Sequence, residues 1–303
     1  MLCHKLVLSM PPIVDVIAPS GRFPIEDLAK IHTYLENQGY IARIPEDILG
    51  PDLLSANSDA LRFEQLKQAL LAEDSQLIWC VRGGYGATRL IPELEKLTPP
   101  PFKKTLIGFS DITALHLFLS QKWDWQTMHG ASLRQMAEPD LNEYSRSLTE
   151  AVLFQGQTSL QYTLNPLNQA AKNLTQPLQA KLSGGNLKLV EASLGTRWQI
   201  DAEPKILVLE EVSEYDFRVD RSLTHLAQAG IFETCQAVVL GDFTHEHAGH
   251  QAKLEPVLQR FANAMAVPVF RLPGMGHGKE NLPWFYAPAK ISDGALLQTF
   301  CLI

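Results

Sequence analysis

Residues 105–119 read TLIGFSDITALHLFL, and they place Ser110 and Asp111 between a short apolar run and a longer helical one. The run TLIGF has the length and β-branched content of a buried strand, and a helix is predicted from residue 111 onward. A serine at such a junction can cap the helix by accepting N–H groups of its first turn. It can equally present a nucleophilic hydroxyl at a strand-to-helix turn. The G-x-S-x-G pattern of such turns is met only at Gly108, so both alternatives stay open.

Strand-like and helical runs alternate on both sides of this stretch. Predicted strands lie at 13–19, 40–44, 75–81 and 105–109, and predicted helices lie at 24–39, 58–73, 87–97 and 111–123. This alternation predicts a mostly parallel sheet with helices on both faces. Such sheets bind ligands at the carboxyl ends of their strands, which is where Ser110 is expected.

The character of the sequence changes after about residue 150. Residues 156–186 are rich in Gln, Asn, Thr and Pro and poor in charge, which indicates extended connections to a second unit. Further strands are predicted at 206–212 and 235–243, and further helices at 186–195, 221–232 and 254–265. We therefore expect a two-domain α/β protein with irregular strands in its second domain and an active site in the cleft between the domains. The predicted divisions are an N-terminal domain at 1–155, a linker region at 156–180 and a C-terminal domain at 181–303.

Composition narrows the class of protein. The 303 residues are 46% hydrophobic, enough for a large core. The formal charge of −7 and the lack of any Lys/Arg block argue against nucleic acid or an anionic membrane as partner. The opening residues 1–20 make a poor signal peptide and no run reaches membrane-span length, so we expect a cytoplasmic protein. Cysteines at 3, 80, 235 and 301 are too far apart for a zinc knuckle or a redox motif.

A glycine-rich loop, RGGYG at 82–86, follows the predicted strand SQLIWCV and should lie at the same sheet edge as Ser110. Glycines let backbone N–H groups approach a bound anion closely. The N–H groups of Gly84 and Asp111 can then form an oxyanion hole beside the serine. Two alternatives are a turn that needs glycine only for its positive φ and a nucleotide phosphate site. The spacing matches neither G-x-G-x-x-G nor a P-loop.

Candidates for a base and an acid come from the second half of the chain. His277 lies in PGMGHGKENLPW, a glycine-flanked irregular segment of the kind that carries function. The run ILVLEEV ends a predicted strand with Glu210 and Glu211, and neighbouring strand residues face opposite ways, so only one can orient a histidine. His129, in HGAS, can line the same cleft. The histidines of THEHAGH at 244–250 lack the H-E-x-x-H spacing, and no metal site is predicted there.

Taken in chain order, these motifs resemble the LD-carboxypeptidases of serine peptidase family S66. The resemblance runs through IAPSG, VRGGYGATRL, IGFSDITALH, HGAS, LSGGNL, ILVLEEVSEYDFRVDR and GHGKENLPW. Because that family has a Ser-Glu-His triad, the resemblance implies Ser110 as nucleophile, Glu210 as acid and His277 as base. Glu210 is chosen over Glu211 since the family's acid is the first acidic residue of a Leu-Glu-(Asp/Glu) motif. The resemblance also implies a two-domain fold different from that of the α/β-hydrolases.

Members of this family hydrolyse the bond between an L-configured centre and a terminal D-amino acid. Typically they release D-alanine from murein tetrapeptide during cytoplasmic cell-wall recycling. The resemblance implies no metal or other cofactor, and it implies a homodimer for many members. A related branch resembles the microcin C immunity proteins and cleaves aminoacyl-nucleotide conjugates, but no long insertion for its extra loop is seen here. A phosphate- or nucleotide-binding α/β protein that uses RGGYG is the alternative from another class.

The substrate's terminal carboxylate requires a cation or N–H donors. Arg82, beside the glycine loop, is the candidate cation, and Gly184, Gly185 and Asn186 are candidates in the opposite domain. The same Gly-Gly-Asn sequence is also typical of a turn before a helix. The sequence departs from the family pattern at HGAS, where many members have His-Gly-Pro, and in the aromatic stretch LPWFYAP at 282–288. Both departures can reshape the pocket.

Overall fold

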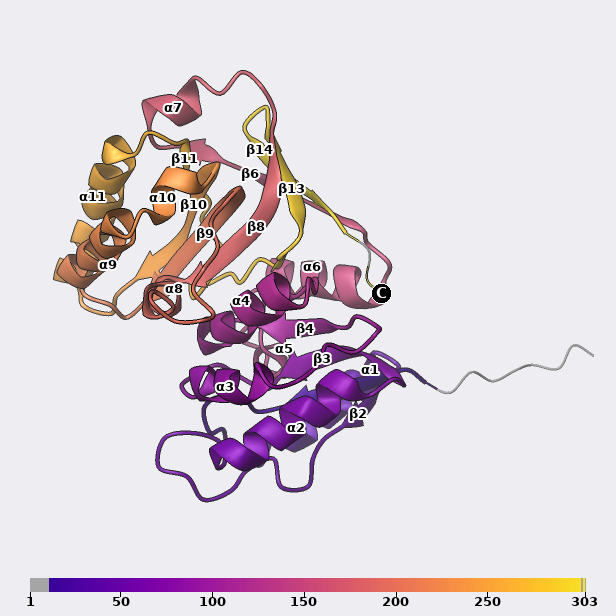
Figure 1. The fold of residues 1–303 in the computed structure, drawn as a ribbon. Coiled ribbons are helices and arrows are strands. Elements are labelled where there is room, and N and C mark those ends of the chain that lie inside the picture. The colour runs from indigo at the N-terminus through magenta and orange to yellow at the C-terminus, as the bar shows by residue number, and fades with distance from the viewer. Residues whose placement is uncertain (1–10, 301, 303) are drawn as a thin grey trace, which may run out of the picture.

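Two β-sheets organise the residues described by the computed structural model, 11–300 and 302 (Figure 1). One sheet belongs mainly to the N-terminal half of the chain and the other to the C-terminal half. Cys3, His4, Cys301 and the first half of the opening segment fall outside the described residues. None of the described helices combines the length and the apolar character needed to cross a bilayer.

The first sheet has the strand order β12-β5-β4-β3-β1-β2. Its strands are β1 (Ile13–Ile17), β2 (Ile41–Arg43), β3 (Ser75–Cys80), β4 (Thr105–Gly108), β5 (Met128–His129) and β12 (Trp284–Phe285). Strands β1 to β5 are parallel, and β12 pairs antiparallel with β5. The mostly parallel sheet predicted from the alternating runs is confirmed, and the last third of the chain adds one edge strand to it.

Helices connect the strands of this sheet. They are α1 (Asp27–Asn37), α2 (Asp59–Leu71), α3 (Ile91–Leu94), α4 (Thr113–Lys122), α5 (Leu133–Ala137) and α6 (Glu143–Phe154), with 3-10 turns η1 (Ala87–Leu90) and η2 (Ser110–Ile112). All four residues of β4 are buried, as expected of a strand covered on both faces. From Thr113 to Leu119 every residue of α4 is buried as well, because this helix lies between the two sheets (Figure 1).

The second sheet has the order β6-β14-β13-β8-β9-β10-β11-β7. Its strands are β6 (Ser159–Thr163), β7 (Asn165–Pro166), β8 (Leu178–Asn186), β9 (Lys205–Val212), β10 (Ala237–Thr244), β11 (Val269–Arg271), β13 (Pro288–Ser292) and β14 (Ala295–Thr299). Strands β8 to β11 are parallel, and the outer pairs are antiparallel. Residues 156–180, which the composition indicates as a linker region, contribute β6 and β7 at the two opposite edges of this sheet.

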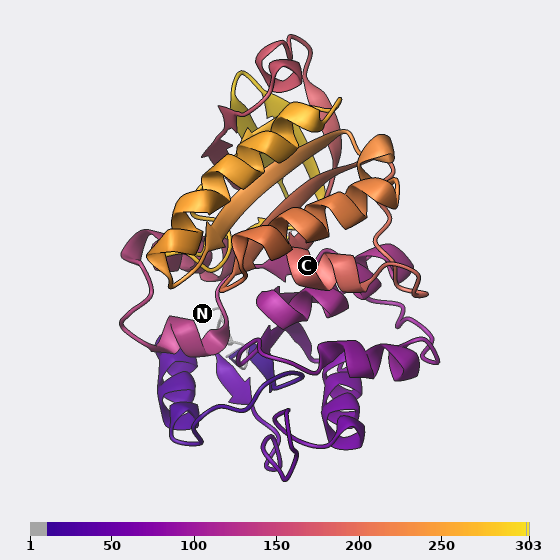
Figure 2. The same cartoon turned by 90° about the vertical axis from the view of Figure 1, so that its left-hand side faces the viewer.

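Helices of the second unit cover one face of its sheet. They are α7 (Gln169–Lys172), α8 (Leu187–Ala192), α9 (Asp216–Gln228), α10 (Ile231–Thr234) and α11 (Ala248–Ala264). Figure 2 shows α9 and α11 side by side across the parallel strands, and the two helices contact each other. The amphipathic α9 buries Val219, Leu223 and Leu226 against the sheet.

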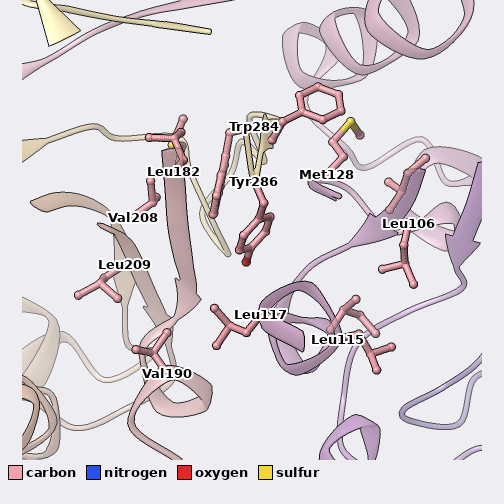
Figure 3. Packing of buried hydrophobic residues seen from close by; sticks show 14 of the residues in the cluster. Leu106, Leu115, Leu117, Met128, Leu182, Val190, Val208, Leu209, Trp284 and Tyr286 are labelled. Atoms are coloured by element: carbon pink, nitrogen blue, oxygen red, sulfur yellow. The ribbon is translucent and has the colours of Figure 1, made fainter. Parts of the chain in front are cut away.

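An apolar contact joins the two units beside α4. Leu117 on α4 points toward Val190 of the second unit, and Trp284 and Tyr286 lie between this contact and Leu182 (Figure 3). All five side chains are buried, and full burial of a leucine contributes roughly 1.5–3 kcal/mol. This contact fixes the carboxyl end of β4 opposite the carboxyl ends of β8 and β9.

Candidate active site

Ser110 occupies a sharp turn between β4 and α4. Its φ is +65°, in the left-handed region that residues other than glycine seldom adopt. Such strain is concentrated at functional turns, where surrounding structure holds it. Ser110 is the first residue of η2, and Phe109 occupies the N-cap position. No side chain caps this turn, and the Ser110 side chain accepts no capping hydrogen bond. The helix-cap alternative for this serine is therefore wrong, and its hydroxyl is left for other chemistry.

The glycine loop packs directly against this turn. A Cβ added to Gly83 would lie 2.7 Å from the Cβ of Ser110, so a side chain there would displace the serine. The carbonyl of Gly83 accepts a 3.2 Å hydrogen bond from the N–H of Gly21. The N–H of Gly84 has no acceptor among the described residues. The structure thus brings Gly84 and Ser110 to one sheet edge.

Asp111 holds this loop through its side chain. Its Oδ2 accepts a 2.6 Å hydrogen bond from the Ser20 hydroxyl and a 2.8 Å bond from the Ala87 N–H. Burial raises the pKa of Asp111, although these two hydrogen bonds oppose the rise. The carboxylate therefore caps η1, the turn after the glycine loop, and not its own helix.

Arg62 is a second support of the loop that the sequence did not single out. Its fully buried guanidinium donates to the carbonyls of Pro19 and Gly86, the latter at 3.0 Å, and to Asp59 Oδ1 at 2.5 Å. Arginine is rarely buried without such partners. Nothing in its helical run distinguishes Arg62, because only the folded structure places Pro19 and Gly86 beside it.

Glu210, which is buried, and His277, which is partly buried, form a close pair. Oε2 of Glu210 lies 2.6 Å from Nδ1 of His277, and Glu210 is 1% exposed near the end of β9. A Cβ on Gly276, where φ is +117°, would lie 2.6 Å from that same oxygen, so glycine permits the approach. Burial alone would lower the pKa of His277, but the charge of Glu210 and the hydrogen bond to it outweigh burial and raise it.

Glu211 faces the opposite side of β9. Its carboxylate accepts hydrogen bonds from Asn186 Nδ2 at 3.0 Å and from the N–H groups of Lys188 and Val212 at 2.9 Å. Burial, followed by the charge of Glu210, raises its pKa to about 7. Strand alternation thus separates the two carboxylates: one meets His277 and the other holds the start of α8.

His277 lies against the residue that precedes the serine. The rings of Phe109 and His277 have centroids 4.6 Å apart. No hydrogen bond joins Ser110 to His277 in this structure, and such bonds are often long in enzymes without substrate. The structure therefore brings the His277–Glu210 pair against Phe109, the neighbour of Ser110, at the junction of the two sheets.

The candidate binding residues take different places. Arg82 is half-buried, donating from Nε to the Gly83 carbonyl at 3.1 Å and from a terminal nitrogen to the Arg22 carbonyl at 2.8 Å. It forms no ion pair with any described carboxylate. Burial, followed by the charge of Arg134, lowers its pKa.

Gly184, Gly185 and Asn186 lie at the end of β8, next to β9. Tyr286 donates to the Gly184 carbonyl at 2.8 Å, and the Asn186 N–H donates to Thr113 Oγ1 at 3.0 Å. The Asn186 side chain caps α8. These contacts tie the end of β8 to Thr113 at the start of α4 and to Tyr286.

The aromatic stretch at 282–288 and the THEHAGH segment lie in different surroundings. Trp284, Phe285 and Tyr286 are buried in β12 and the contact between the units. In THEHAGH, His250 Nδ1 lies 2.7 Å from Asp216 Oδ1. Across the described residues, no group of three or more His, Cys, Asp or Glu side chains could hold a metal ion.

Comparison with known proteins places both halves of the chain in one family. A model described as the LD-carboxypeptidase N-terminal domain matches residues 14–130, and one described as the LD-carboxypeptidase C-terminal domain matches residues 179–289. A Rickettsia conorii protein that carries a carboxypeptidase name is 42% identical over 76% of this chain and 72% of its own length. The murein tetrapeptide carboxypeptidase of Pseudomonas aeruginosa is 28% identical over 94% of each chain.

Solved structures share the same fold. The muramoyltetrapeptide carboxypeptidase from Oxalobacter formigenes superposes with a TM-score of 0.77 at 24% identity, over 94% of this chain and 97% of that one. A protein from Bacillus anthracis described as like the immunity protein MccF gives a TM-score of 0.82 at 18% identity, over 97% and 98%. At these identities the likeness extends to the fold and not to the substrate.

Proposed function

The chain belongs to the LD-carboxypeptidase family, and from this premise we propose that it is a serine peptidase that releases D-alanine from murein tetrapeptide. The observation that carries the proposal is the assembly of three groups at one junction. Ser110 has a strained φ and no capping bond, the ring of its neighbour Phe109 contacts His277, and His277 is paired with Glu210 at 2.6 Å. The name of the Pseudomonas aeruginosa relative supports murein tetrapeptide as substrate.

The proposed first half-reaction forms an acyl-enzyme. Ser110 Oγ attacks the scissile carbonyl carbon while Nε2 of His277 takes the hydroxyl proton. The Nδ1–H of His277 donates to Glu210, whose charge stabilises the imidazolium that forms. The carbonyl oxygen, now an oxyanion, accepts from the N–H groups of Gly84 and Asp111, and each such donor contributes about a hundredfold or more to rate. Collapse breaks the C–N bond, and His277 protonates the departing amine of D-alanine.

Deacylation follows the same route in reverse. His277, neutral again, takes a proton from water as the water oxygen attacks the ester carbonyl. The second oxyanion uses the same two N–H groups. When the C–O bond breaks, His277 returns its proton to Ser110 Oγ, and the shortened peptide leaves as a carboxylate. Every proton passes through the one imidazole, so the charge of Glu210 assists both steps.

Arg82 is the proposed anchor for the terminal carboxylate of the substrate. It lies next to Gly83, which packs on Ser110, and its guanidinium has no described carboxylate partner. Arginine binds carboxylates with paired, geometrically matched N–H groups. A carboxylate held there would place the preceding peptide bond near the serine, which is the requirement for removing a single terminal residue.

An assay on defined muropeptides tests the proposal. Wild-type protein incubated with murein tetrapeptide should yield tripeptide and D-alanine by mass spectrometry, and Ser110→Ala should yield neither. Ser292→Ala, a matched change at the last residue of β13, should cleave like wild type. Absence of cleavage by wild type, or full cleavage by Ser110→Ala, would contradict the proposal. Cleavage of an aminoacyl-nucleotide conjugate in place of the muropeptide would support the microcin-type alternative.

We also propose a cytoplasmic location and a homodimeric assembly. Both rest on the family resemblance. Sedimentation of the purified protein measures the assembly, and fractionation of cells that express the tagged chain measures the location.

A further inference from the structure

His129 lies fully buried at the end of β5, where it touches both halves of the site. Its backbone pairs with Gly108 of β4, two residues before Ser110, and with Trp284 of β12. Its side chain reaches the second sheet, where Nε2 lies 4.0 Å from Oε1 of Glu210. The proposed mechanism assigns no part to this histidine.

Three polar atoms at this contact have no hydrogen-bond partner among the described residues. They are both ring nitrogens of His129 and Oε1 of Glu210, on side chains that are 0% and 1% exposed. Leaving one buried polar group unpaired costs roughly 1–3 kcal/mol, and native proteins do so rarely. A ring nitrogen and a carboxylate oxygen that both lack partners therefore face each other. The second oxygen of Glu210 is already bonded to His277.

The surroundings keep His129 neutral and its ring in place. Burial, followed by the charges of His116 and His277, lowers the pKa of His129 well below that of a free histidine. A neutral imidazole has one N–H donor and one acceptor nitrogen. The ring stacks on Trp284 with centroids 5.1 Å apart and planes 19° apart, while the His116 ring lies 6.2 Å away. Stacking keeps the plane of the ring nearly parallel to the indole of Trp284.

We propose that His129 is a positioning residue whose Nε2–H donates to Oε1 of Glu210, so that the carboxylate is held at both oxygens. The inference rests on the proposed part of Glu210 as acid of the triad. His129 Nε2 and Glu210 Oε1 are 4.0 Å apart, so an approach of about 1 Å brings them within hydrogen-bonding distance. One water molecule bonded to both atoms would make the same connection. Because His129 carries no charge, it orients Glu210 without cancelling the negative charge that the His277 imidazolium needs.

Two substitutions distinguish a hydrogen-bonding role of His129 from a role of its ring in packing alone. His129→Phe keeps an aromatic ring on Trp284 but removes the N–H, whereas His129→Gln keeps a donor at the reach of Nε2. We expect kcat of His129→Phe to fall about 10- to 100-fold, the range for a hydrogen bond to a charged group, with KM changed less than about threefold. His129→Gln should recover most of kcat even if it is less stable than His129→Phe. If the loss of kcat in the two variants follows their stability and not the presence of the N–H donor, the proposal is overturned.

The pH profile gives a second readout. The charged or titratable groups that act on Glu210 and its two histidine neighbours are His277 on its loop, Glu211 on the same strand, Asp242 on β10, Tyr286 next to β12, His129 on β5, and His116 on α4 beside His129. Without the N–H of His129, the negative charge of Glu210 is no longer partly compensated by a hydrogen bond at Oε1. The carboxylate then stabilises the imidazolium of His277 more strongly and raises the pKa of His277. The acidic limb of kcat should therefore move to higher pH in His129→Phe and return in His129→Gln. An unmoved limb with wild-type kcat in His129→Phe would overturn the proposal.

A measurement without substrate keeps this inference distinct from the proposed function. In ¹⁵N NMR of histidine-labelled wild type, assigned by comparison with His129→Gln, the His129 ring should be neutral and protonated at Nε2 near pH ~7. A cationic ring or protonation at Nδ1 would overturn the proposal. If wild type fails to cleave the muropeptide while the tautomer is as expected, the proposed substrate fails and the positioning contact stands.

Discussion

The hydroxyl of Ser20 donates a 2.6 Å hydrogen bond to the carboxylate of Asp111, across 91 positions of the chain. The same oxygen accepts the N–H of Ala87. Asp111 therefore connects the first loop of the molecule, the glycine loop and the turn that carries Ser110. One carboxylate next to the serine thus fixes the relative positions of three segments that meet at the proposed oxyanion hole.

Substitution Asp111→Ala should reduce both activity and stability. It leaves the buried Ala87 N–H unpaired, a loss of roughly 1–3 kcal/mol in the free energy of unfolding. It also frees the glycine loop, so we expect kcat to fall at least about tenfold at a temperature where the variant is folded. Urea unfolding and muropeptide turnover measure the two effects. Asp140→Ala, at an exposed loop, is the control, and wild-type kcat in folded Asp111→Ala would contradict the expectation.

Substitution Glu210→Gln should shift the pH profile as well as lower kcat. The reaction needs neutral His277, so activity rises with pH through the pKa of this histidine. Glu210 raises that pKa, and the acidic limb of wild type should therefore lie above the usual value of about 6.5. Without the carboxylate, burial dominates and the limb should move to lower pH.

Glu211→Gln is the matched control for that prediction. Glu211 faces α8, and its pKa of about 7 means that the neutral form is already populated near neutral pH. The kcat of Glu211→Gln should stay within about threefold of the wild-type value. The acidic limb of its pH profile should move only slightly. Equal losses in the two variants would contradict the assignment of Glu210 as the acid.

Substitution Arg82→Met should remove the preference for a free terminal carboxylate. The ratio of kcat/KM for a tetrapeptide to that for its C-terminal amide should fall about 10- to 100-fold, since a charged hydrogen bond is lost from the acid alone. Arg197→Met, at an exposed site, should keep the wild-type ratio. If Arg82→Met lowered kcat/KM equally for the tetrapeptide and its amide, the terminal carboxylate would be bound elsewhere.

Substitution Gly83→Ala should disable the serine and lower the free energy of unfolding by roughly 1–3 kcal/mol through overpacking. The added Cβ would fall 2.7 Å from Ser110 Cβ, so the turn must shift and the attacking oxygen with it. Misplacement of about 1 Å can cost on the order of a hundredfold in rate. A Cβ at Gly249 meets no atom within 4 Å, so Gly249→Ala should keep the wild-type kcat and melting temperature. Comparison of kcat and melting temperature for the two variants tests this, and an active Gly83→Ala would show that the loop adapts.

Local patterns in the sequence were enough to predict several elements of the site. Apolar runs of strand length and helical periodicity predict β3, β4 and β9 and the order in which they occur, because these signals depend on neighbouring residues. The turn after β4 and the glycine loop after β3 follow from the same patterns. Resemblance to a family added the choice of Ser110, Glu210 and His277, which local reasoning alone had left open.

Other features were decided only by the tertiary structure. The composition of residues 156–180 indicates a linker, but the segment supplies both edge strands of the second sheet, because edge pairing depends on distant partners. Residues 284–285 likewise join the first sheet. His129, Arg62 and the side chain of Asp111 matter through contacts with residues 24 to 91 positions away.

The sequence by itself therefore determined the central strands and main helices and their order, and its resemblance to a family selected Ser110, Glu210 and His277 as candidates. Only the packing of the two sheets decided that Ser110 does not cap its helix, which face of β9 meets His277, and that His129 stands unpaired beside Glu210. Propensity and periodicity act over a few residues, whereas hydrogen bonds and burial at a junction depend on segments brought together from the whole chain.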